Sequence, residues 1–413
     1  MLPFVWECKY IYFLSICKIF VLNLSIEKRA FARSRLLGVQ KYGLFLIRQN
    51  IMKKFLLIFA TVGILASACK NETPATIYDL SSFGQLQALV DEHQVPVLQC
   101  KYVAPAEEQS FLFTCQDTLF EITNPVNENS IFQAASLSKP MFAYIVMKMV
   151  DNGELDLDTP ICEYTDIDRF ADKEMAGKLT PRIVLSHQTG LPNWAAGPSS
   201  DEWPTSTIEF KYPADSCFAY SGEGYAFLQR AVETVRGASL DEIAKKEVFE
   251  PLGLEHTSYG WLDEYDTIAL PGFNDEGVNR GQGRHPRENC AYTLRTNATD
   301  YAKFLVALMN GEGLSEKIHK EMFTPQVHAI RYADEHRDCD STVFWCLGFG
   351  SVREDYFWHW GDNGNFKALW LMHPATKEVA VYFTNSAHGH DFLNVFLKNL
   401  TGEDLPLHDW INN

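Results

Sequence analysis

The sequence is short of positive charge and of long apolar runs, and each shortage excludes a class of protein. Its 413 residues include 36 Lys and Arg against 53 Asp and Glu, a formal net charge of −17. Such a deficit argues against nucleic acid as a partner, because a phosphate backbone attracts basic proteins. No stretch reaches the roughly eighteen uninterrupted apolar residues of a membrane-spanning helix. A protein that crosses the membrane many times is therefore excluded.

Motifs for several common chemistries are also missing. No two cysteines have the Cys-x-x-Cys spacing, so we expect neither a zinc site nor a thioredoxin-type centre. A Gly-x-Ser-x-Gly nucleophile elbow and a glycine-rich phosphate loop are absent, which leaves α/β-hydrolase and nucleotide-dependent functions without support. We expect no metal and no cofactor. The 46% of hydrophobic residues still suffices for a large core, in one large domain or two smaller ones.

The scarce positive charge is concentrated at the front of the chain. Residues 1–68 carry ten Lys or Arg and two Asp or Glu, which leaves 26 basic and 51 acidic residues for the rest. From Met52 the sequence reads Met-Lys-Lys, then an uncharged run over 55–66, then small residues before Cys69. This layout predicts a signal peptide over 52–68.

Cys69, directly after the small residues, resembles the first mature residue of a bacterial lipoprotein. Its lipidation would anchor the protein by acyl chains, the one membrane contact that we expect. Ala66 stands where such signals usually have Leu, so plain cleavage after Ala68 is the alternative. Residues 1–51 lie upstream of an export signal, and we interpret them as an extension from a wrongly assigned start, with a real membrane anchor as the alternative. We expect an exported protein, periplasmic or an outer-membrane lipoprotein of a bacterium.

The order of expected elements predicts the fold class. Strand-like runs at 95–102 and 111–120 precede a helix at 137–152 and a loop-rich, partly helical middle. The further elements are helices at 82–92, 179–186, 225–236, 240–248, 299–309 and 390–400, and strands at 344–352, 356–360, 368–373 and 379–384. We predict an α/β (α+β) domain over residues 76–400, in which both ends of the chain form an antiparallel sheet flanked by helices, with a mostly helical lobe inserted.

Seven cysteines follow Cys69. Because seven is odd, at least one thiol stays free or pairs between chains. Cys100 and Cys115 fall in the first two strand-like runs, and an oxidising compartment would permit a bridge between them.

The beginning of the helix at 137–152 carries the main chemical signal. Residues 136–140 read Ser-Leu-Ser-Lys-Pro, and residues three apart on a helix share a face, so the Ser136 hydroxyl and the Lys139 amine can meet. Pro140 fits the first helical turn, where a missing amide hydrogen is tolerated. Burial against apolar neighbours would lower the pKa of Lys139 and let it act as a base for the serine. An isolated Ser-x-x-Lys match is weak evidence, since an N-cap serine beside a solvated lysine also produces it.

Two further motifs strengthen this interpretation. Tyr-Ser-Gly stands at 220–222 and His-Trp-Gly at 359–361. Residues 185–192 read Leu-Ser-His-Gln-Thr-Gly-Leu-Pro, and residues 249–254 read Phe-Glu-Pro-Leu-Gly-Leu. In this order, and over roughly residues 80–400, the chain resembles the serine β-lactamase and penicillin-binding protein superfamily, closest to its class C and esterase branch. The resemblance implies the β-lactamase/transpeptidase fold.

The resemblance also implies catalytic roles. Ser136 would be the acylated nucleophile and Lys139 the group that takes its proton. Tyr220 would share the base role and return the proton to the leaving group. His359 holds the position of the third motif's Lys or His.

Three further residues would surround the substrate by the same resemblance. Gly361 would leave room for the substrate beside the strand. The backbone N–H groups of Ser136 and Asp362 would form the oxyanion hole, and each such donor is worth about 10²–10³ in rate. Gly222 ends the second motif, where the family usually has an Asn that binds the substrate's amide.

The departures from the family pattern set the functional hypotheses. Gly222 removes one substrate hydrogen bond, and a neutral His359 is a poor partner for a substrate carboxylate at pH 7. We therefore expect a secreted serine hydrolase that acts on a small ester, amide or peptide, with β-lactams or D-amino-acid peptides among the possibilities. The alternative is a penicillin-binding or sensor-type protein that keeps the fold and turns over poorly. We interpret Glu223 as a solvated loop residue, with a polar group supplied to the cleft as the alternative.

Overall fold

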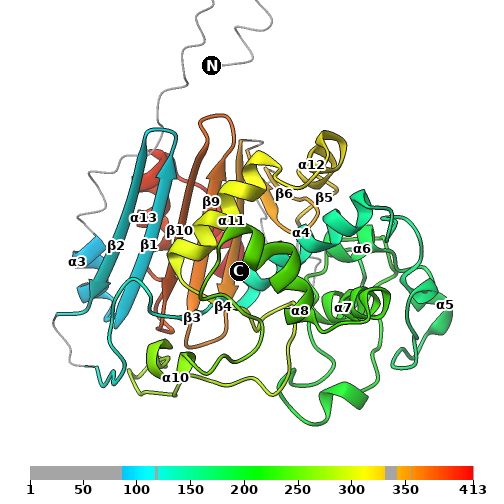
Figure 1. Cartoon of the computed structure of the whole chain (residues 1–413), viewed down its shortest axis with the longest axis horizontal. Coiled ribbons are helices and arrows are strands. Elements are labelled where there is room, and N and C mark those ends of the chain that lie inside the picture. The colour runs from blue at the N-terminus through cyan, green and yellow to red at the C-terminus, as the bar shows by residue number, and fades with distance from the viewer. Residues whose placement is uncertain (1–85, 117–119, 331–341, 354, 413) are drawn as a thin grey trace, which may run out of the picture. The chain divides into compact units, whose positions relative to one another are not determined.

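Strands from both ends of the chain lie side by side in one antiparallel sheet (Figure 1). The computed structural model describes residues 86–116, 120–330, 342–353 and 355–412. Within them the strand order is β2-β1-β10-β9-β8-β7-β6-β5, and β3 and β4 form a separate pair. The strands are β1 (Val97–Ala104), β2 (Glu107–Thr114), β3 (Phe132–Gln133), β4 (Arg295–Thr296), β5 (Val327–His328), β6 (Val343–Trp345), β7 (Gly350–Val352), β8 (Tyr356–Asp362), β9 (Lys367–His373) and β10 (Glu378–Thr384).

The pairing of β1 with β10 joins the two ends. Leu98 lies opposite Thr384, and Val103 lies opposite Val379. Every residue of β10 is buried, because neighbouring strands flank it and helices cover both of its faces. The predicted antiparallel sheet formed from both ends of the chain is confirmed.

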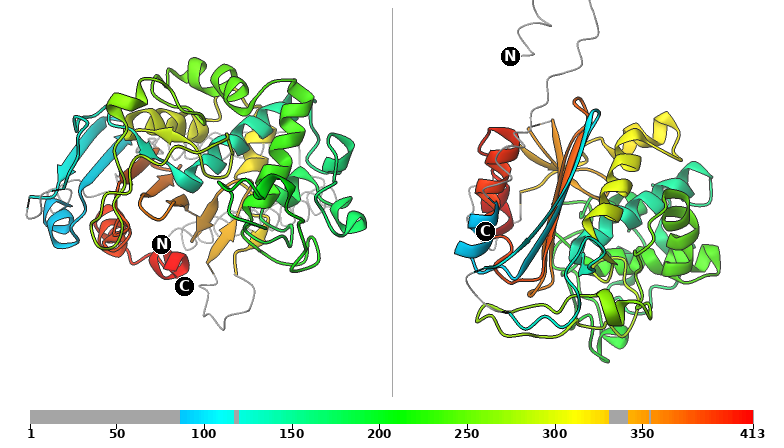
Figure 2. Two further views of the ribbon diagram at one scale, coloured as in Figure 1. Left: turned by 90° about the horizontal axis from the view of Figure 1, so that it is seen from below. Right: turned by 60° about the vertical axis from the view of Figure 1, so that its left-hand side comes forward.

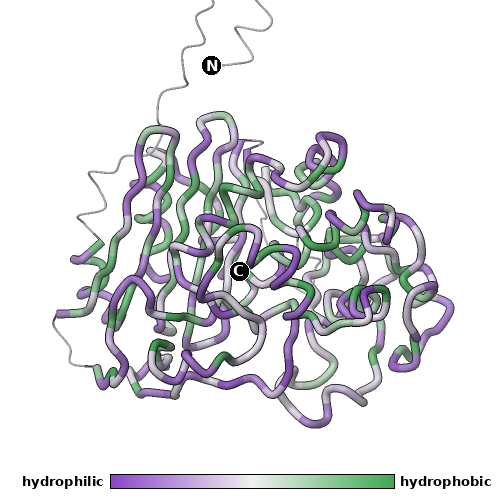
Figure 3. Tube along the Cα trace, in the orientation of Figure 1, coloured by the Kyte–Doolittle hydropathy of each residue, from purple (hydrophilic) through white to green (hydrophobic). Residues whose placement is uncertain are grey.

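Helices cover the two faces of the sheet unequally (Figure 2). The thin layer of α3, α13 and α14 packs on one face, and α4, α11 and the helical lobe pack on the other. Hydrophobic residues follow the strands and the helices against them, whereas the outer loops are mostly hydrophilic (Figure 3).

Among the described residues, none of the helices is both long and apolar enough to cross a membrane. The helices are α3 (Leu86–Glu92), α4 (Ser138–Asp151), α5 (Lys173–Ala176), α6 (Pro181–Leu185), α7 (Gly222–Arg236), α8 (Leu240–Ala244), α9 (Glu250–Leu252), α10 (Tyr265–Ile268), α11 (Ala298–Asn310), α12 (Glu316–Met322), α13 (Leu393–Thr401) and α14 (Leu407–Asn412).

Helix α4 is more deeply buried than its apolar pattern suggests. The spacing of Met141, Ile145 and Met149 predicts one buried face, yet nearly the whole helix is buried, including Ser138 and Lys139. A helix that is enclosed on all sides belongs to the core of a large domain. The side chains at its N-terminal end are therefore held in fixed positions by the surrounding core.

Three predicted elements are wrong in extent. The run at 344–352 is a hairpin of β6 and β7 rather than one strand, because Cys346 donates its N–H to the Phe349 carbonyl across a turn that contains Gly348 at φ +110°. The run at 111–120 begins earlier, as β2, and ends at Thr114. The helix at 240–248 is interrupted after α8 by a π-helical turn (Lys245–Phe249).

Several predictions concern the front of the chain. The extension 1–51, the signal peptide 52–68 and Cys69 lie outside the described residues and stay predictions.

The cysteines in the first hairpin are not bridged. Cys100 and Cys115 are both free thiols, and the register of β1 and β2 places Phe111 opposite Cys100. The disulfide that the sequence permitted is therefore absent.

Alkylation of the denatured protein should test this point. Without reductant, peptides containing Cys100 and Cys115 should both carry the alkyl group in full, and prior reduction should add none. Peptide mass mapping measures this directly. A disulfide-linked pair of these two peptides would contradict the structure.

Candidate active site

Ser136 lies in a tight turn between β3 and α4. Ala135–Leu137 form a 3-10 turn, and Ala135 has a φ of +49°, which is unfavourable for a residue with a side chain. The turn persists because neighbours fix it: Ser138 Oγ donates to the Ala135 carbonyl at 2.5 Å, and Tyr301 Oη donates to the Leu137 carbonyl at 2.8 Å. The nucleophile predicted from the sequence thus sits on a strained but well-supported backbone.

Gly361 of β8 allows this turn to press against the sheet. A Cβ on Gly361 would lie 2.4 Å from the Ala134 carbonyl oxygen and 3.2 Å from the Ala135 Cβ. The backbone next to Ser136 takes the space that a side chain at position 361 would fill, and the interpretation that Gly361 leaves room for substrate stays a prediction. The glycine sets the distance between the turn and strand β8.

Lys139 is brought into hydrogen-bond contact with Ser136. Its Nζ lies 3.1 Å from Ser136 Oγ and donates at 2.8 Å to the carbonyl of Ala291. Only 1% of Lys139 is exposed, and burial lowers its pKa to about 7. At neutral pH a large share of this amine is therefore unprotonated and can accept a proton.

Tyr220 lies beside the lysine. The Lys139 Nζ is 4.7 Å from the centroid of the Tyr220 ring. His187 stacks on that ring with centroids 4.1 Å apart, and the His187 Nδ1 accepts the N–H of Ser221 at 3.1 Å. The Leu-Ser-His segment thereby positions the second motif next to the first.

His359 is buried next to Tyr220 rather than in the wall of the cavity. Its Nδ1 lies 2.7 Å from the Trp360 carbonyl oxygen, which accepts only, so Nδ1 carries the proton. Burial, with Lys139 nearby, holds the pKa of His359 well below its usual value. The imidazole is thus neutral, and among the described residues its Nε2 has no hydrogen-bond partner. His359 supplies no positive charge for a substrate.

A cavity of about 350 Å³ opens over the Ser136–Lys139 pair. Asp362 lines it, as do Asn193, Trp194 and Tyr292, whereas the predicted residues Tyr220, Gly222, His359 and Gly361 are not among the lining residues. Within the described residues, no group of three or more His, Cys, Asp or Glu side chains has the arrangement of a metal site.

The backbone N–H of Asp362 points away from β9. Asn363 donates its N–H to the Phe366 carbonyl, and hydrogen-bonded pairs alternate along an antiparallel ladder. The pair Asp362–Lys367 is therefore a non-hydrogen-bonded one, and Asp362 turns its N–H away from β9. Strand β7 pairs with β8 only up to Trp358, so this N–H points to an edge that none of the described strands covers.

Trp194 fills the space beside Gly222. A Cβ on Gly222 would lie 2.3 Å from Cζ2 of the Trp194 indole. Asn193 accepts the Gly222 N–H with its side-chain oxygen at 2.9 Å. The volume that an Asn at position 222 would need is thus taken by an aromatic wall of the cavity.

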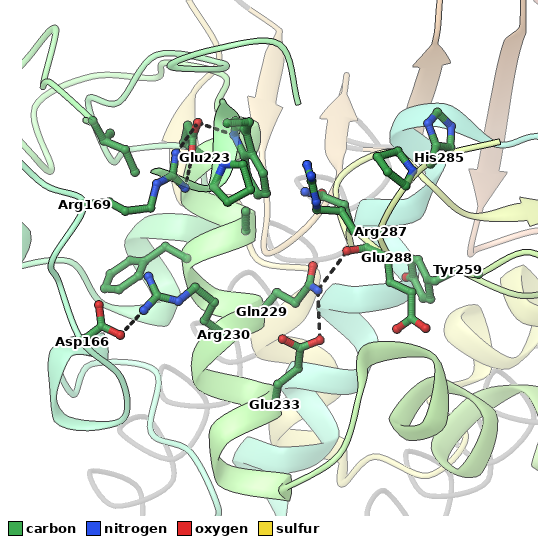
Figure 4. A pocket seen from close by; sticks show the side chains of 18 of the residues that line it. Asp166, Arg169, Glu223, Gln229, Arg230, Glu233, Tyr259, His285, Arg287 and Glu288 are labelled. Carbon is green, nitrogen blue, oxygen red and sulfur yellow. Dashed lines mark hydrogen bonds and ion pairs between the residues drawn. The ribbon is translucent and has the colours of Figure 1, made fainter. Parts of the chain in front are cut away.

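Glu223 is not the solvated loop residue expected from the sequence. It is fully buried and forms an ion pair with Arg169 at 3.2 Å (Figure 4). It also accepts the Ala195 N–H at 3.0 Å and the Trp203 indole N–H at 2.7 Å. This carboxylate therefore holds the residue after Trp194 and the Trp203 ring that packs against Trp194. The sequence did not reveal this role because the partners of Glu223 are 20 to 54 residues away.

His285 also lines a larger cavity of about 770 Å³. Two of its three arginines, Arg169 and Arg230, are paired with Glu223 and Asp166 respectively (Figure 4). Neither Ser136 nor Lys139 lines it. Size alone would thus select the wrong cavity, and the buried serine–lysine pair identifies the smaller one.

Sequence analysis missed Asn193 and Trp194. Both follow directly after the Leu-Ser-His-Gln-Thr-Gly-Leu-Pro segment, and this adjacency was the available signal.

Comparison with known proteins shows the family to which the chain is similar. A sequence model of the Beta-lactamase family matches residues 118–397. Penicillin-binding protein 4 of Amycolatopsis lactamdurans is 33% identical over 306 residues, which cover 67% of this chain and 78% of that protein.

Solved structures show the same fold. A D-stereospecific amidohydrolase from Streptomyces sp. has a TM-score of 0.64 at 15% identity, covering 79% of this chain and 99% of that chain. A class C β-lactamase has a TM-score of 0.60 at 16% identity, covering 73% and 89%.

The contact between Trp194 and Gly222 generates a stability prediction. Gly222→Ala should lower the free energy of unfolding by about 1–3 kcal/mol, as overpacking does, although Ala is the better helix former by about 1 kcal/mol. In a Trp194→Ala background the same change should be neutral or stabilising. Urea unfolding of the four proteins measures the coupling, and an equal effect in both backgrounds would contradict the clash.

Proposed function

Because this chain belongs to the Beta-lactamase family of serine hydrolases, we propose that it hydrolyses an acyl compound through a covalent acyl-enzyme on Ser136. The observation that carries the proposal is the buried Lys139 amine, 3.1 Å from Ser136 Oγ with a pKa lowered to about 7. A neutral amine at this distance can take the serine proton, and the Oγ then becomes a nucleophile.

The proposed reaction has two halves. In the first, Ser136 Oγ attacks the substrate carbonyl carbon while its proton passes to Lys139, and the leaving group departs with a proton returned through Tyr220. In the second, water attacks the ester carbonyl while Lys139 takes its proton, the bond between the acyl carbon and Ser136 Oγ breaks, Oγ takes the proton back from Lys139, and the acid product leaves. The N–H groups of Ser136 and Asp362 would stabilise the negative oxygen in both halves.

The charges around the cavity favour an uncharged substrate. Among the described lining residues, Lys139 is the one Lys or Arg side chain, and it is buried against Ser136. His285 also lines the cavity, but burial and Arg295 lower its pKa to about 4, so it is neutral. Asp362 lines the cavity as well, but its carboxylate is paired with Lys367 at 2.7 Å, so apart from Lys139 a substrate carboxylate meets no cation among the described lining residues. We therefore propose that neutral esters or amides are better substrates than β-lactams or peptides with a free carboxylate.

The proposed cellular location rests on residues 52–69. We propose that the signal peptide directs export and that Cys69 becomes the lipid-modified N-terminus. Mass analysis of the mature N-terminus would show a diacyl or triacyl Cys69, whereas an unmodified Cys69 would mean plain cleavage.

Active-site labelling tests the acyl-enzyme directly. Incubation with a nitrophenyl ester should release nitrophenol over many turnovers and leave a trapped acyl group on Ser136. Ser136→Ala should abolish both, with less than about 1 kcal/mol of stability lost. Peptide mass mapping locates the adduct, and a chromogenic cephalosporin serves as the charged comparison. Absence of any adduct on Ser136 would overturn the proposal, and a stable adduct without turnover would favour the sensor-type protein.

The lowered pKa of Lys139 predicts the pH dependence. Below about pH 7 the amine binds a proton, so kcat/KM for a neutral ester should rise as the pH increases through about 7. Between about 7 and 10.5 the unfolded chain binds more protons than the folded one, so the free energy of unfolding should also rise with pH over this window.

The matched variant is Lys139→Met, which is one atom shorter, keeps an unbranched apolar side chain and removes the amine. It should lose most of the esterase activity and should flatten the rise in stability above pH 7. Rates and urea unfolding at pH 6 to 9 test both. A wild-type pH profile retained by this variant would show that another group accepts the proton.

A further inference from the structure

The peptide that joins Gly361 to Asp362 is held from its carbonyl side by a histidine far away in the sequence. His390 Nε2 lies 3.2 Å from the Gly361 carbonyl oxygen. In a trans peptide the C=O and N–H point in opposite directions. The N–H of Asp362, on the opposite side of this peptide, is the one that faces the uncovered edge of β8.

The protonation of His390 follows from its partners. The Gly361 carbonyl can accept only, so Nε2 of His390 must carry the hydrogen. Its Nδ1 lies 2.8 Å from Tyr382 Oη. Burial holds the pKa of His390 below its usual value, so the ring is neutral and its Nδ1 accepts the tyrosine hydrogen. The chain of donors therefore runs from Tyr382 through His390 to the Gly361 carbonyl.

The surrounding loop holds His390 in this place. His390 is 4% exposed and Tyr382 is fully buried. A Cβ on Gly389 would lie 1.8 Å from Thr384 Oγ1 and 2.8 Å from Lys367 Cβ, so a glycine is needed for the loop to press against β9 and β10. Phe273 accepts the Ala387 N–H and donates its own N–H to Asn385. The loop that carries His390 is therefore held against β9 and β10.

We propose that His390 is a positioning residue for hydrolysis: it orients and polarises the Gly361–Asp362 peptide so that the Asp362 N–H stabilises the negative oxygen. The inference rests on the proposed function. A donor to a peptide carbonyl strengthens the N–H of the same peptide as a donor, because linked hydrogen bonds polarise one another. The effect acts on the transition state, so it should appear in kcat more than in KM.

Three variants separate this role from a structural one. His390→Leu removes the imidazole donor at similar volume and leaves the ladder bond between Gly361 and Ala368 in place, and His390→Gln keeps a side-chain N–H donor. His388→Leu is the matched control, since it makes the same change in the same loop, where His388 contacts Asp391 at 2.8 Å and the Asp275 carbonyl instead of β8. Each variant is first checked for folding by its circular dichroism spectrum and melting temperature.

The measurements are kcat and KM for a nitrophenyl ester and the infrared carbonyl stretch of a ¹³C-labelled acyl group on Ser136. His390→Leu should lower kcat by about tenfold, less than the 10²–10³ lost when a whole oxyanion donor is removed, and should change KM less than twofold. Its carbonyl band should move to higher wavenumber, since the acyl oxygen is less polarised. His390→Gln should keep most of the wild-type kcat and a carbonyl band close to the wild-type position, and His388→Leu should match the wild type in both.

Each outcome decides the question. Wild-type kcat and an unshifted band in folded His390→Leu would overturn the inference, and so would His390→Gln if it were as impaired as His390→Leu. If His390→Leu does not fold, Tyr382→Phe replaces it, and a loss in kcat with a band shift is expected there; an unchanged kcat and band would overturn the inference. Failure of the wild type to acylate Ser136 would instead refute the proposed function itself.

Discussion

The burial of one lysine is the constraint on which the site depends. Lys139 can approach Ser136 with a partly unprotonated amine only because α4 is enclosed on nearly all sides. Burying an amine costs free energy whenever it is charged. The surrounding helices, sheet and the Ala291 carbonyl must therefore offset that cost, and the size of the domain, with its large core on this face of the sheet, makes this feasible.

Two glycines then determine how closely the other parts approach. Gly361 lets the turn that carries Ser136 pack directly on β8, and Gly222 lets the Trp194 indole pack over the start of α7. Gly222 ends the second motif and Gly361 ends the third. A side chain at either position would displace the residues that pack against it and so move a wall of the cavity. The missing Cβ atoms are thus as important to the geometry as the groups that react.

A buried ion pair holds the part of the cavity wall that contains Trp194. The Glu223–Arg169 pair binds the loop around Trp194 to the start of α7. Removing one partner from such a pair leaves a buried charge without compensation, which typically costs about 3–5 kcal/mol. The pair therefore ties the shape of the cavity to the packing of the helical lobe.

The sequence by itself determined the family resemblance, the antiparallel sheet formed from both ends of the chain and the contact between Ser136 and Lys139. These follow from local rules: alternation along strands, and a spacing of three residues on one helix. It also gave the sign of the Lys139 pKa shift. The tertiary structure alone decided that His359 is buried and neutral, that Glu223 is paired, and that Trp194 occupies the space beside Gly222. It also decided the split of β6 and β7 and the contact of His390 with the Gly361 peptide. Each of these depends on atoms that are distant in sequence, and no periodicity or motif encodes which distant groups meet.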